Sequence, residues 1–196
     1  TEDAKKDTVT DISAVDLSDI ADGRVAGCTN TGIVEADLNV GGITGTMGLE
    51  SSVDPEDDRP SGSLTQRRRY ELKAIVDGCE NVGTVTAKRS YAGGICGRME
   101  LGLITDSRGY GRISSENGDY VGGIAGLTGG TVRDSFAKCT LSGNNYVGGV
   151  VGSGIQEDIS GDSSTVTGCY SMVEVTEYKQ FVGAVSGGNA GVFTNN

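Results

Sequence analysis

A short glycine-rich phrase returns five times along this chain and constrains its fold more than any other feature. The copies read VGGITG, AGGICG, VGGIAG, VGGVVG and VGAVSG, at residues 40–45, 92–97, 121–126, 147–152 and 182–187. Such recurrence is typical of repeat proteins, in which each repeat is one supersecondary unit that packs on its neighbours. We therefore interpret the chain as an array of five repeats.

Two further apolar segments accompany each copy of the phrase. One ends in Cys or Ser, as in VAGC, VDGC, ITDS, VRDS and VTGC, and the other is centred on a branched residue further along. The residues at this second position are Val34, Val85, Ile113, Leu141 and Val175. The segments are short, β-branched and bounded by Gly, Asn, Asp and Ser, which is typical of strands.

The repeats predict an all-β fold, a right-handed parallel β-helix (β-solenoid) of about five coils with three short strands per coil. Val121 and Ile124 would face its interior, and Gly122 and Gly123 would let the chain bend at a corner. A sandwich of hairpins is the alternative, but Asn117-Gly118 is the one good hairpin turn. We expect residues 1–22 to form a cap or incomplete coil, residues 23–187 the repeats, and residues 188–196 the start of a truncated further repeat.

Composition excludes several classes of function. The net charge of −11 disfavours nucleic acid and anionic membranes as partners. The chain has no histidine, which removes a Ser-His-Asp triad and the commonest zinc ligand. An apolar run long enough to cross a membrane does not occur in the sequence. We expect no cofactor, no metal site, no catalytic residues and no membrane insertion of this fragment.

The stretch YVGGIAGLTGGTVRDSFAKCTLSGNNYVGGVVG, residues 120–152, resembles the GLUG repeat of bacterial surface proteins. That repeat also occurs in the non-catalytic region of IgA-specific metallopeptidases. The resemblance extends over residues 23–187, with departures at the cysteines, at Ala184 and at two insertions. It implies an extracellular or cell-surface fragment of a larger bacterial protein. The zinc-binding histidines of those peptidases have no counterpart here, so it implies no peptidase activity.

Insertions at 46–73 and 153–164 interrupt the array at the same point of the repeat, and would leave the same corner of a solenoid. The longer one carries acidic residues followed by basic ones, and we predict it as a ligand-binding loop. The candidate residues are Asp54, Glu56, Asp57, Asp58, Arg67, Arg68, Arg69 and Tyr70. A solvated flap is the alternative, and a Ca²⁺ site lacks the required spacing. The partner would be an unknown protein or glycan on a host or neighbouring cell surface.

Cys28, Cys79 and Cys169 share one repeat position with Ser107 and Ser135. This interchange predicts small, buried, reduced side chains. Cys28 and Cys79 fall in neighbouring repeats, so a disulfide between them stays open.

Parallel β-helices also carry polysaccharide lyases and hydrolases, so a carbohydrate-active enzyme is the alternative to a non-enzymatic adhesion or spacer module. Asp106 and Asp134 share one position where other repeats have glycine, which predicts a turn with positive φ rather than a catalytic pair. Tyr91, Tyr120 and Tyr146 each precede the glycine-rich phrase, and Phe181 lies at the same place. They predict an aromatic ladder, either packed or able to stack on sugars.

Overall fold

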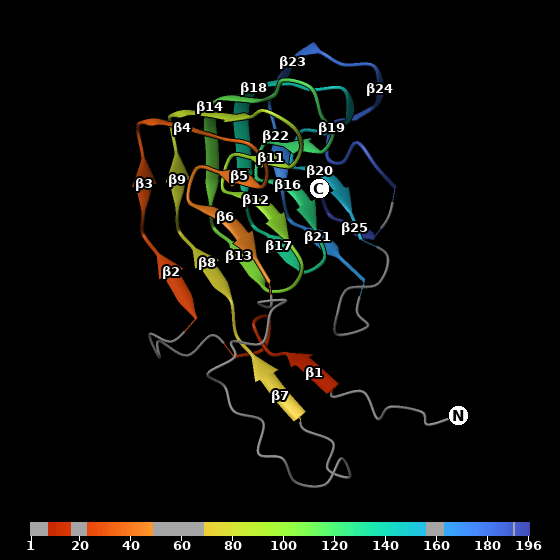
Figure 1. The fold of residues 1–196 in the computed structure, drawn as a ribbon. Coiled ribbons are helices and arrows are strands. Elements are labelled where there is room, and N and C mark those ends of the chain that lie inside the picture. The colour runs from red at the N-terminus through yellow and green to blue at the C-terminus, as the bar shows by residue number, and fades with distance from the viewer. Residues whose placement is uncertain (1–7, 17–22, 49–68, 156–162, 190) are drawn as a thin grey trace, which may run out of the picture.

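Strands paired in parallel, without any helix, make up the described part of the chain. The computed structural model describes residues 8–16, 23–48, 69–155, 163–189 and 191–196. Figure 1 shows the strands of each repeat beside those of the preceding repeat, in sequence order from one side of the molecule to the other. The prediction of an all-β chain is therefore confirmed for these residues.

Four sheets run along the repeat array. The first contains β2 (Arg24–Ala26), β8 (Ile75–Asp77), β13 (Leu103–Thr105), β17 (Thr131–Arg133), β21 (Thr165–Thr167) and β25 (Val192–Thr194). The second contains β3 (Thr29–Asn30), β4 (Ile33–Ala36), β9 (Glu80–Asn81), β10 (Thr84–Ala87), β14 (Arg108–Ser115), β18 (Phe136–Ser142), β22 (Tyr170–Ser171) and β23 (Glu174–Glu177). The third contains β5 (Val40–Gly41), β11 (Ala92–Gly93), β15 (Val121–Gly122), β19 (Asn145–Gly148) and β24 (Gln180–Gly183). The fourth contains β6 (Thr44–Met47), β12 (Cys96–Met99), β16 (Ala125–Thr128) and β20 (Val151–Gly154).

The register of every sheet follows the repeats. In the third sheet Val40, Ala92, Val121, Val147 and Val182 pair in succession. The same holds in the first sheet for Val25, Val76, Ile104, Val132 and Val166, and in the second for Val34, Val85, Ile113, Leu141 and Val175. The repeat alignment read from the sequence, with equivalent residues paired in parallel, is confirmed.

The number of strands per repeat differs from the predicted three, because each of the first four repeats contributes to four sheets and the fifth to three. The glycine-rich phrase is the cause, since it bends sharply instead of forming one strand. In the copy at 121–126, β15 ends at Gly122 and β16 begins at Ala125. A Cβ atom at Gly122 would overlap the backbone O of Ala125, so the bend requires glycine at that place.

Branched apolar side chains from all four sheets fill the space between them. Val121 and Ile124 are fully buried, as predicted, and so are Val85, Ile104 and Leu141. These residues belong to one continuous cluster. Each fully buried Val, Leu or Ile side chain stabilises the fold by about 1.5–3 kcal/mol. The same positions of the repeat are therefore apolar and buried from one repeat to the next.

The chain outside the repeats adds a separate pair of strands, β1 (Thr8–Asp11) and β7 (Arg69–Leu72), which are parallel (Figure 1). Asp11 Oδ2 accepts a hydrogen bond from the amide of Gly102 at 2.6 Å, and Ser13 Oγ accepts one from the amide of Ala74 at 2.9 Å. The N-terminal segment is therefore attached where the fourth sheet leads into the first. Both insertions also connect a strand of the fourth sheet to one of the first.

Candidate functional site: the corner between the second and third sheets

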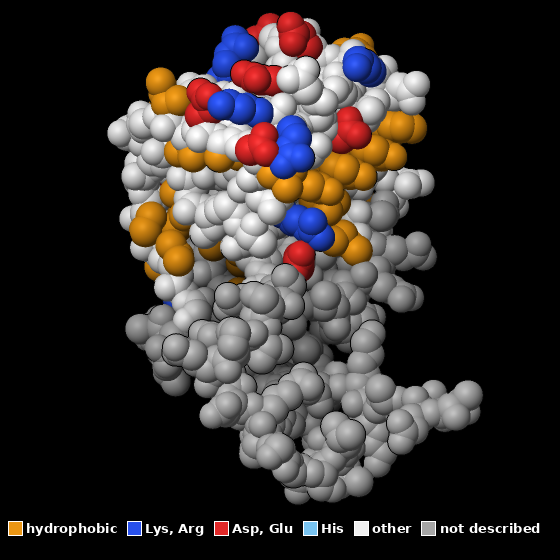
Figure 2. All heavy atoms as spheres, viewed as in Figure 1, with side chains coloured by type: hydrophobic (Ala, Val, Ile, Leu, Met, Phe, Trp, Pro, Cys, Tyr) orange, Lys and Arg blue, Asp and Glu red, His pale blue; other side chains and the backbone are white. Residues whose placement is uncertain are grey.

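The corner at which the second sheet leads into the third carries exposed charged side chains of both signs. Figure 2 shows Lys, Arg, Asp and Glu side chains gathered at the top of the molecule, where Figure 1 places the ends of β14 and β18. Two ion pairs lie at this corner, Lys88 with Glu35 at 3.4 Å and Arg89 with Asp37 at 2.6 Å. All four side chains are more than half exposed, so these pairs contribute little to stability.

An aromatic ladder lies at this corner, formed by the residue that directly precedes the glycine-rich phrase in each of four repeats. The ring centroids of Tyr91 and Tyr120 are 5.1 Å apart, those of Tyr120 and Tyr146 are 4.8 Å apart, and those of Tyr146 and Phe181 are 4.8 Å apart. The interplanar angles are 13°, 3° and 11°. The guanidinium carbon of Arg98 lies 5.4 Å from the Tyr91 centroid. The predicted ladder is confirmed as a stack.

Stacking decides which faces of the ladder a ligand could reach. Tyr120 and Tyr146 each have a ring on both faces, and Tyr91 lies between Arg98 and Tyr120. A sugar stacks on the face of a ring rather than on its edge, so these three rings do not form a sugar platform. Each ladder residue has a positive φ, from 56° to 65°. This conformation costs about 1–3 kcal/mol per residue, and ring stacking offsets part of that cost.

A recess opens at the same corner beside the fourth repeat. The connection from β18 to β19 is shorter than that from β14 to β15 in the third repeat. The fifth repeat takes up its extra residue as a bulge after Val175, where Ser142 pairs with Glu177, so its connection from β23 to β24 is as short as that of the fourth repeat. The hollow has a volume of about 230 Å³, and its lining comes from the third, fourth and fifth repeats: Ser115, Glu116, Ser142, Gly143, Asn144, Glu177, Tyr178 and Lys179.

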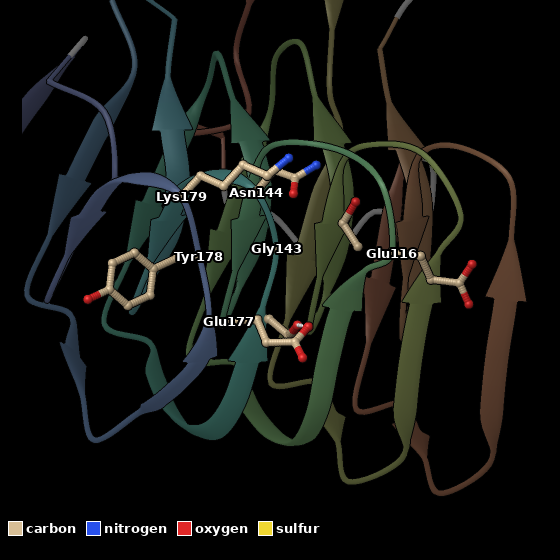
Figure 3. Close-up of a pocket in the computed structure, with 8 residues that line it drawn as sticks. Glu116, Gly143, Asn144, Glu177, Tyr178 and Lys179 are labelled. Carbon is tan, nitrogen blue, oxygen red and sulfur yellow. Dashed lines mark hydrogen bonds between the residues drawn. The ribbon is translucent and has the colours of Figure 1, made fainter.

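Polar groups of several kinds surround this recess. In Figure 3, Glu116 and Tyr178 lie at its two ends, Lys179 and Asn144 lie along one side, and Glu177 lies along the other. Ser142 Oγ lies 3.1 Å from Glu177 Oε2 and donates a hydrogen bond to it, which fixes the direction of that carboxylate. The backbone O of Asn144 accepts a hydrogen bond from the amide of Lys179 at 2.6 Å. The recess thus offers carboxylates, an ammonium group, an amide and an aromatic ring at short range.

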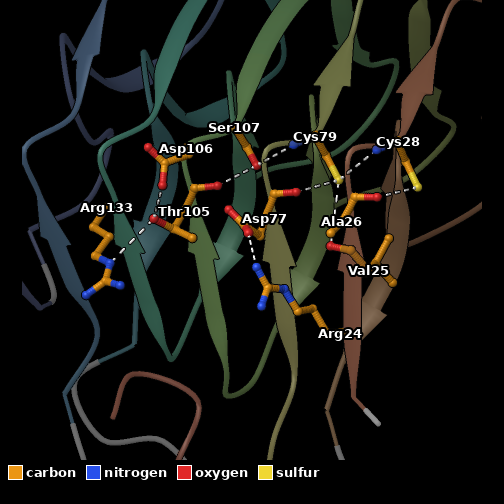
Figure 4. A network of polar contacts seen from close by, with 10 residues as sticks. All are labelled: Arg24, Val25, Ala26, Cys28, Asp77, Cys79, Thr105, Asp106, Ser107 and Arg133. Carbon is orange, nitrogen blue, oxygen red and sulfur yellow. Dashed lines mark hydrogen bonds and ion pairs between the residues drawn. The ribbon is translucent and has the colours of Figure 1, made fainter. Parts of the chain in front are cut away.

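The turns between the first and second sheets explain why Cys and Ser interchange (Figure 4). The amide of Cys28 donates to Cys79 Sγ at 3.4 Å, the amide of Cys79 to Ser107 Oγ at 3.2 Å, and the amide of Ser107 to Ser135 Oγ at 3.2 Å. In each turn the side chain also donates to the backbone O two residues earlier, as Ser107 Oγ does to Thr105 at 2.8 Å. Either a thiol or a hydroxyl can accept the hydrogen bond from the amide and donate one to the backbone O. Cys and Ser can therefore replace each other in this turn.

All five cysteines are free thiols, and four of them are buried. The prediction of a buried side chain is wrong for Cys28, which is exposed because it belongs to the first repeat, whose outer edge no described repeat covers. Burial raises the pKa of Cys96 to about 11, of Cys139 to about 12 and of Cys169 to about 11. These thiols are protonated near neutral pH and are poor nucleophiles.

We expect the free energy of unfolding to fall as the pH rises from about 9 to about 11. The folded chain keeps the proton on a thiol of raised pKa longer than the unfolded chain does, so stability is full below this range and is lost through it. For Cys96, whose ordinary pKa is 9.0 and whose folded value is about 11, the loss is about 3 kcal/mol. Denaturant unfolding at pH 8 and at pH 11 measures it. A Cys96→Ala chain should lose less, and an equal loss would contradict the assignment.

Asp106 and Asp134 occupy turns with φ of 49° each. The equivalent residues Gly27, Gly78 and Gly168 have φ between 58° and 63°. The prediction of a turn that needs positive φ is therefore confirmed. Thr105 Oγ1 donates to Asp106 Oδ2 at 3.0 Å, so this carboxylate takes part in the turn itself.

The ligand-binding residues predicted from the sequence fall mostly outside the described residues. This applies to Asp54, Glu56, Asp57, Asp58, Arg67 and Arg68. Arg69 and Tyr70 are described as backbone of β7, and their side chains lie outside the description. The hypothesis that the longer insertion is a ligand-binding loop stays a prediction.

Sequence reasoning missed the lining of the recess. Its signal in the sequence is the longer connection before the glycine-rich phrase in the third repeat, which the two larger insertions overshadowed. Within the described ranges, no three His, Cys, Asp or Glu side chains come together as metal ligands. The described residues also contain no helix with the length and hydrophobicity that a membrane crossing requires.

Comparisons with known protein families, with curated proteins and with solved structures found no match to this chain. The resemblance to the GLUG repeat therefore depends on the repeated residues alone.

Proposed function

We propose that this chain is a non-enzymatic extracellular module of a bacterial surface protein, built as a right-handed parallel β-helix, that acts as an adhesion and spacer element. The observation that carries this proposal is the parallel register, which holds from the first repeat to the fifth in the second and third sheets. An array in which each repeat pairs with the next keeps a fixed spacing between its two ends. It also presents the same corner of every repeat along one side.

Two further observations support a stiff, non-enzymatic module. The ladder of Tyr91, Tyr120, Tyr146 and Phe181 ties the repeats together at their exposed corner, which favours a stiff array. The buried thiols are protonated at neutral pH, which argues against thiol catalysis. The GLUG-like repeats add the expectation of a bacterial cell surface, with a protein or glycan as partner.

A carbohydrate-active enzyme is the second candidate, and one observation favours it. Glu116 and Glu177 line the same recess, and glycoside hydrolases act through a pair of carboxylates. The hydrogen bond from Ser142 occupies one oxygen of Glu177. Hydrolysis of a bound polysaccharide would separate this enzyme from a binding module.

An array of immobilised glycans, followed by a reducing-sugar assay on every polysaccharide that binds, tests the proposed function. We expect binding that saturates and no release of reducing ends. Release that disappears in both Glu116→Gln and Glu177→Gln chains would establish the enzyme instead. Absence of binding to every glycan and to intact bacterial or host cells would contradict an adhesion role.

The acidic and basic insertion is tested with a chain that lacks Pro55–Arg69. Loss of binding in this chain, with its unfolding midpoint unchanged, would support the insertion as the contact. Unchanged binding would assign recognition to another part of the surface, such as the corner between the second and third sheets.

A further inference from the structure

We propose that the recess at the fourth repeat binds one uncharged pyranose unit of a glycan. This inference rests on the proposed adhesion function and names the ligand class for one particular place. It follows from three properties of the recess: its size, its charges and the arrangement of its polar groups.

Size limits the ligand to about one sugar unit. The recess has a volume of about 230 Å³, below the range of about 300–1,000 Å³ that is typical of pockets for drug-sized molecules. Along the array it lies between Ser115 and Glu116 of the third repeat and Glu177, Tyr178 and Lys179 of the fifth. A longer glycan would therefore place one unit in the recess and run across the surface on both sides.

Charge argues against an anionic ligand and against a bare metal ion. Two carboxylates and one ammonium group, those of Glu116, Glu177 and Lys179, line the recess, and the whole chain has a net charge of −11. An anion would be repelled by the carboxylates. The recess has no third carboxylate with which to hold a bare metal ion, and no group of three ligating side chains occurs among the described residues. A neutral ligand that both donates and accepts hydrogen bonds fits this mixture of charges.

The polar groups suit neighbouring hydroxyl groups on a ring. Glu177 accepts hydrogen bonds only, Lys179 donates only, and the amide of Asn144 does both. Adjacent hydroxyls of a pyranose can donate to a carboxylate and accept from an ammonium group at the same time. Ser142 holds the Glu177 carboxylate in place by its hydrogen bond at 3.1 Å, which lowers the entropy cost of binding. Tyr178, 60% exposed at one end of the recess, offers an aromatic face of the kind that Tyr91, Tyr120 and Tyr146 do not.

The test uses methyl glycosides of glucose, galactose, mannose and N-acetylglucosamine, titrated into isotope-labelled chain and followed by amide chemical shifts. We expect at least one of them to bind with a Kd of about 1 mM and to shift the amides of Gly143, Asn144 and Lys179. A Lys179→Met chain should bind about tenfold more weakly. The matched control is Lys88→Met, which removes a lysine from the same corner of the second repeat, outside the recess.

Two results would overturn the inference. One is binding that shifts amides elsewhere and leaves those of the recess unchanged. The other is an equal effect, or no effect, of the two lysine substitutions on a glycoside that binds. If immobilised glycans bind the chain while no methyl glycoside shifts the recess amides, the pyranose site is wrong and the adhesion function stands. If neither glycans nor cells bind, the adhesion function fails as well. The amide spectrum of each variant, superposed on that of the parent chain, shows that the fold is retained.

Discussion

Replacing Ile124 by alanine should destabilise the chain by about 2–5 kcal/mol. Ile124 is fully buried at the bend between the third and fourth sheets. Its backbone O accepts hydrogen bonds from the amides of Ile95 and Cys96 at 2.9 Å and 3.0 Å. The substitution leaves these backbone bonds in place and removes three side-chain carbons from the middle of the array, where a repeat lies on each side. Urea unfolding, followed by circular dichroism, measures the loss.

The matched control for this substitution is Ile33→Ala. Ile33 lies in β4 at the edge of the array and is 79% exposed, so we expect its replacement to change stability by less than about 0.5 kcal/mol. Equal losses at the two positions would contradict the placement of Ile124 in a shared interior.

Replacing Gly122 by alanine should destabilise the chain by about 3 kcal/mol or more, because the added methyl group has no room. Its Cβ would overlap the backbone O of Ala125 and lie 2.8 Å from the backbone N of Gly152 in the next repeat. Both neighbours are main-chain atoms, so relief requires the bend itself to open. The unfolding midpoint and the amide spectrum together show whether the sheets separate.

Gly32→Ala provides the comparison for Gly122→Ala. The nearest atom to a Cβ at Gly32 is Asn30 Oδ1 at 3.6 Å, an ordinary contact. We expect this control to be neutral, or slightly stabilising through the lower entropy of the unfolded chain. A Gly122→Ala chain as stable as the Gly32→Ala chain would show that the glycine-rich phrase does not make the tight bend.

The sequence was sufficient to predict the parallel pairing of successive repeats, because the repeats align residue by residue. Val85, Ile113 and Leu141 share a position in the repeat, and the same three residues pair in the second sheet. The aromatic ladder was predictable for the same reason. A residue type that returns at one position of successive repeats must lie beside its equivalents once the repeats are paired in parallel.

Other features depend on differences between repeats, which a consensus hides. The recess lies where the short connection before Val147 follows the longer connection of the third repeat, and no residue in it stands out by type. The exposure of Cys28 depends on its place in the first repeat and not on its local sequence. The bend that divides the glycine-rich phrase between two sheets was read correctly as a corner, but the prediction of three strands per repeat was wrong, because the first four repeats each contribute to four sheets.

The parallel pairing of successive repeats is tested most directly by nuclear Overhauser contacts in the isotope-labelled chain. We expect contacts between the side chains of Ile95 and Ile124, and between those of Ile124 and Val150. The amides of Ile95 and Ile124 donate to Ile124 O and Val150 O at 2.9 Å and 2.8 Å, respectively. Strong contacts between Hα atoms of adjacent strands, the mark of antiparallel hairpins, would contradict the account.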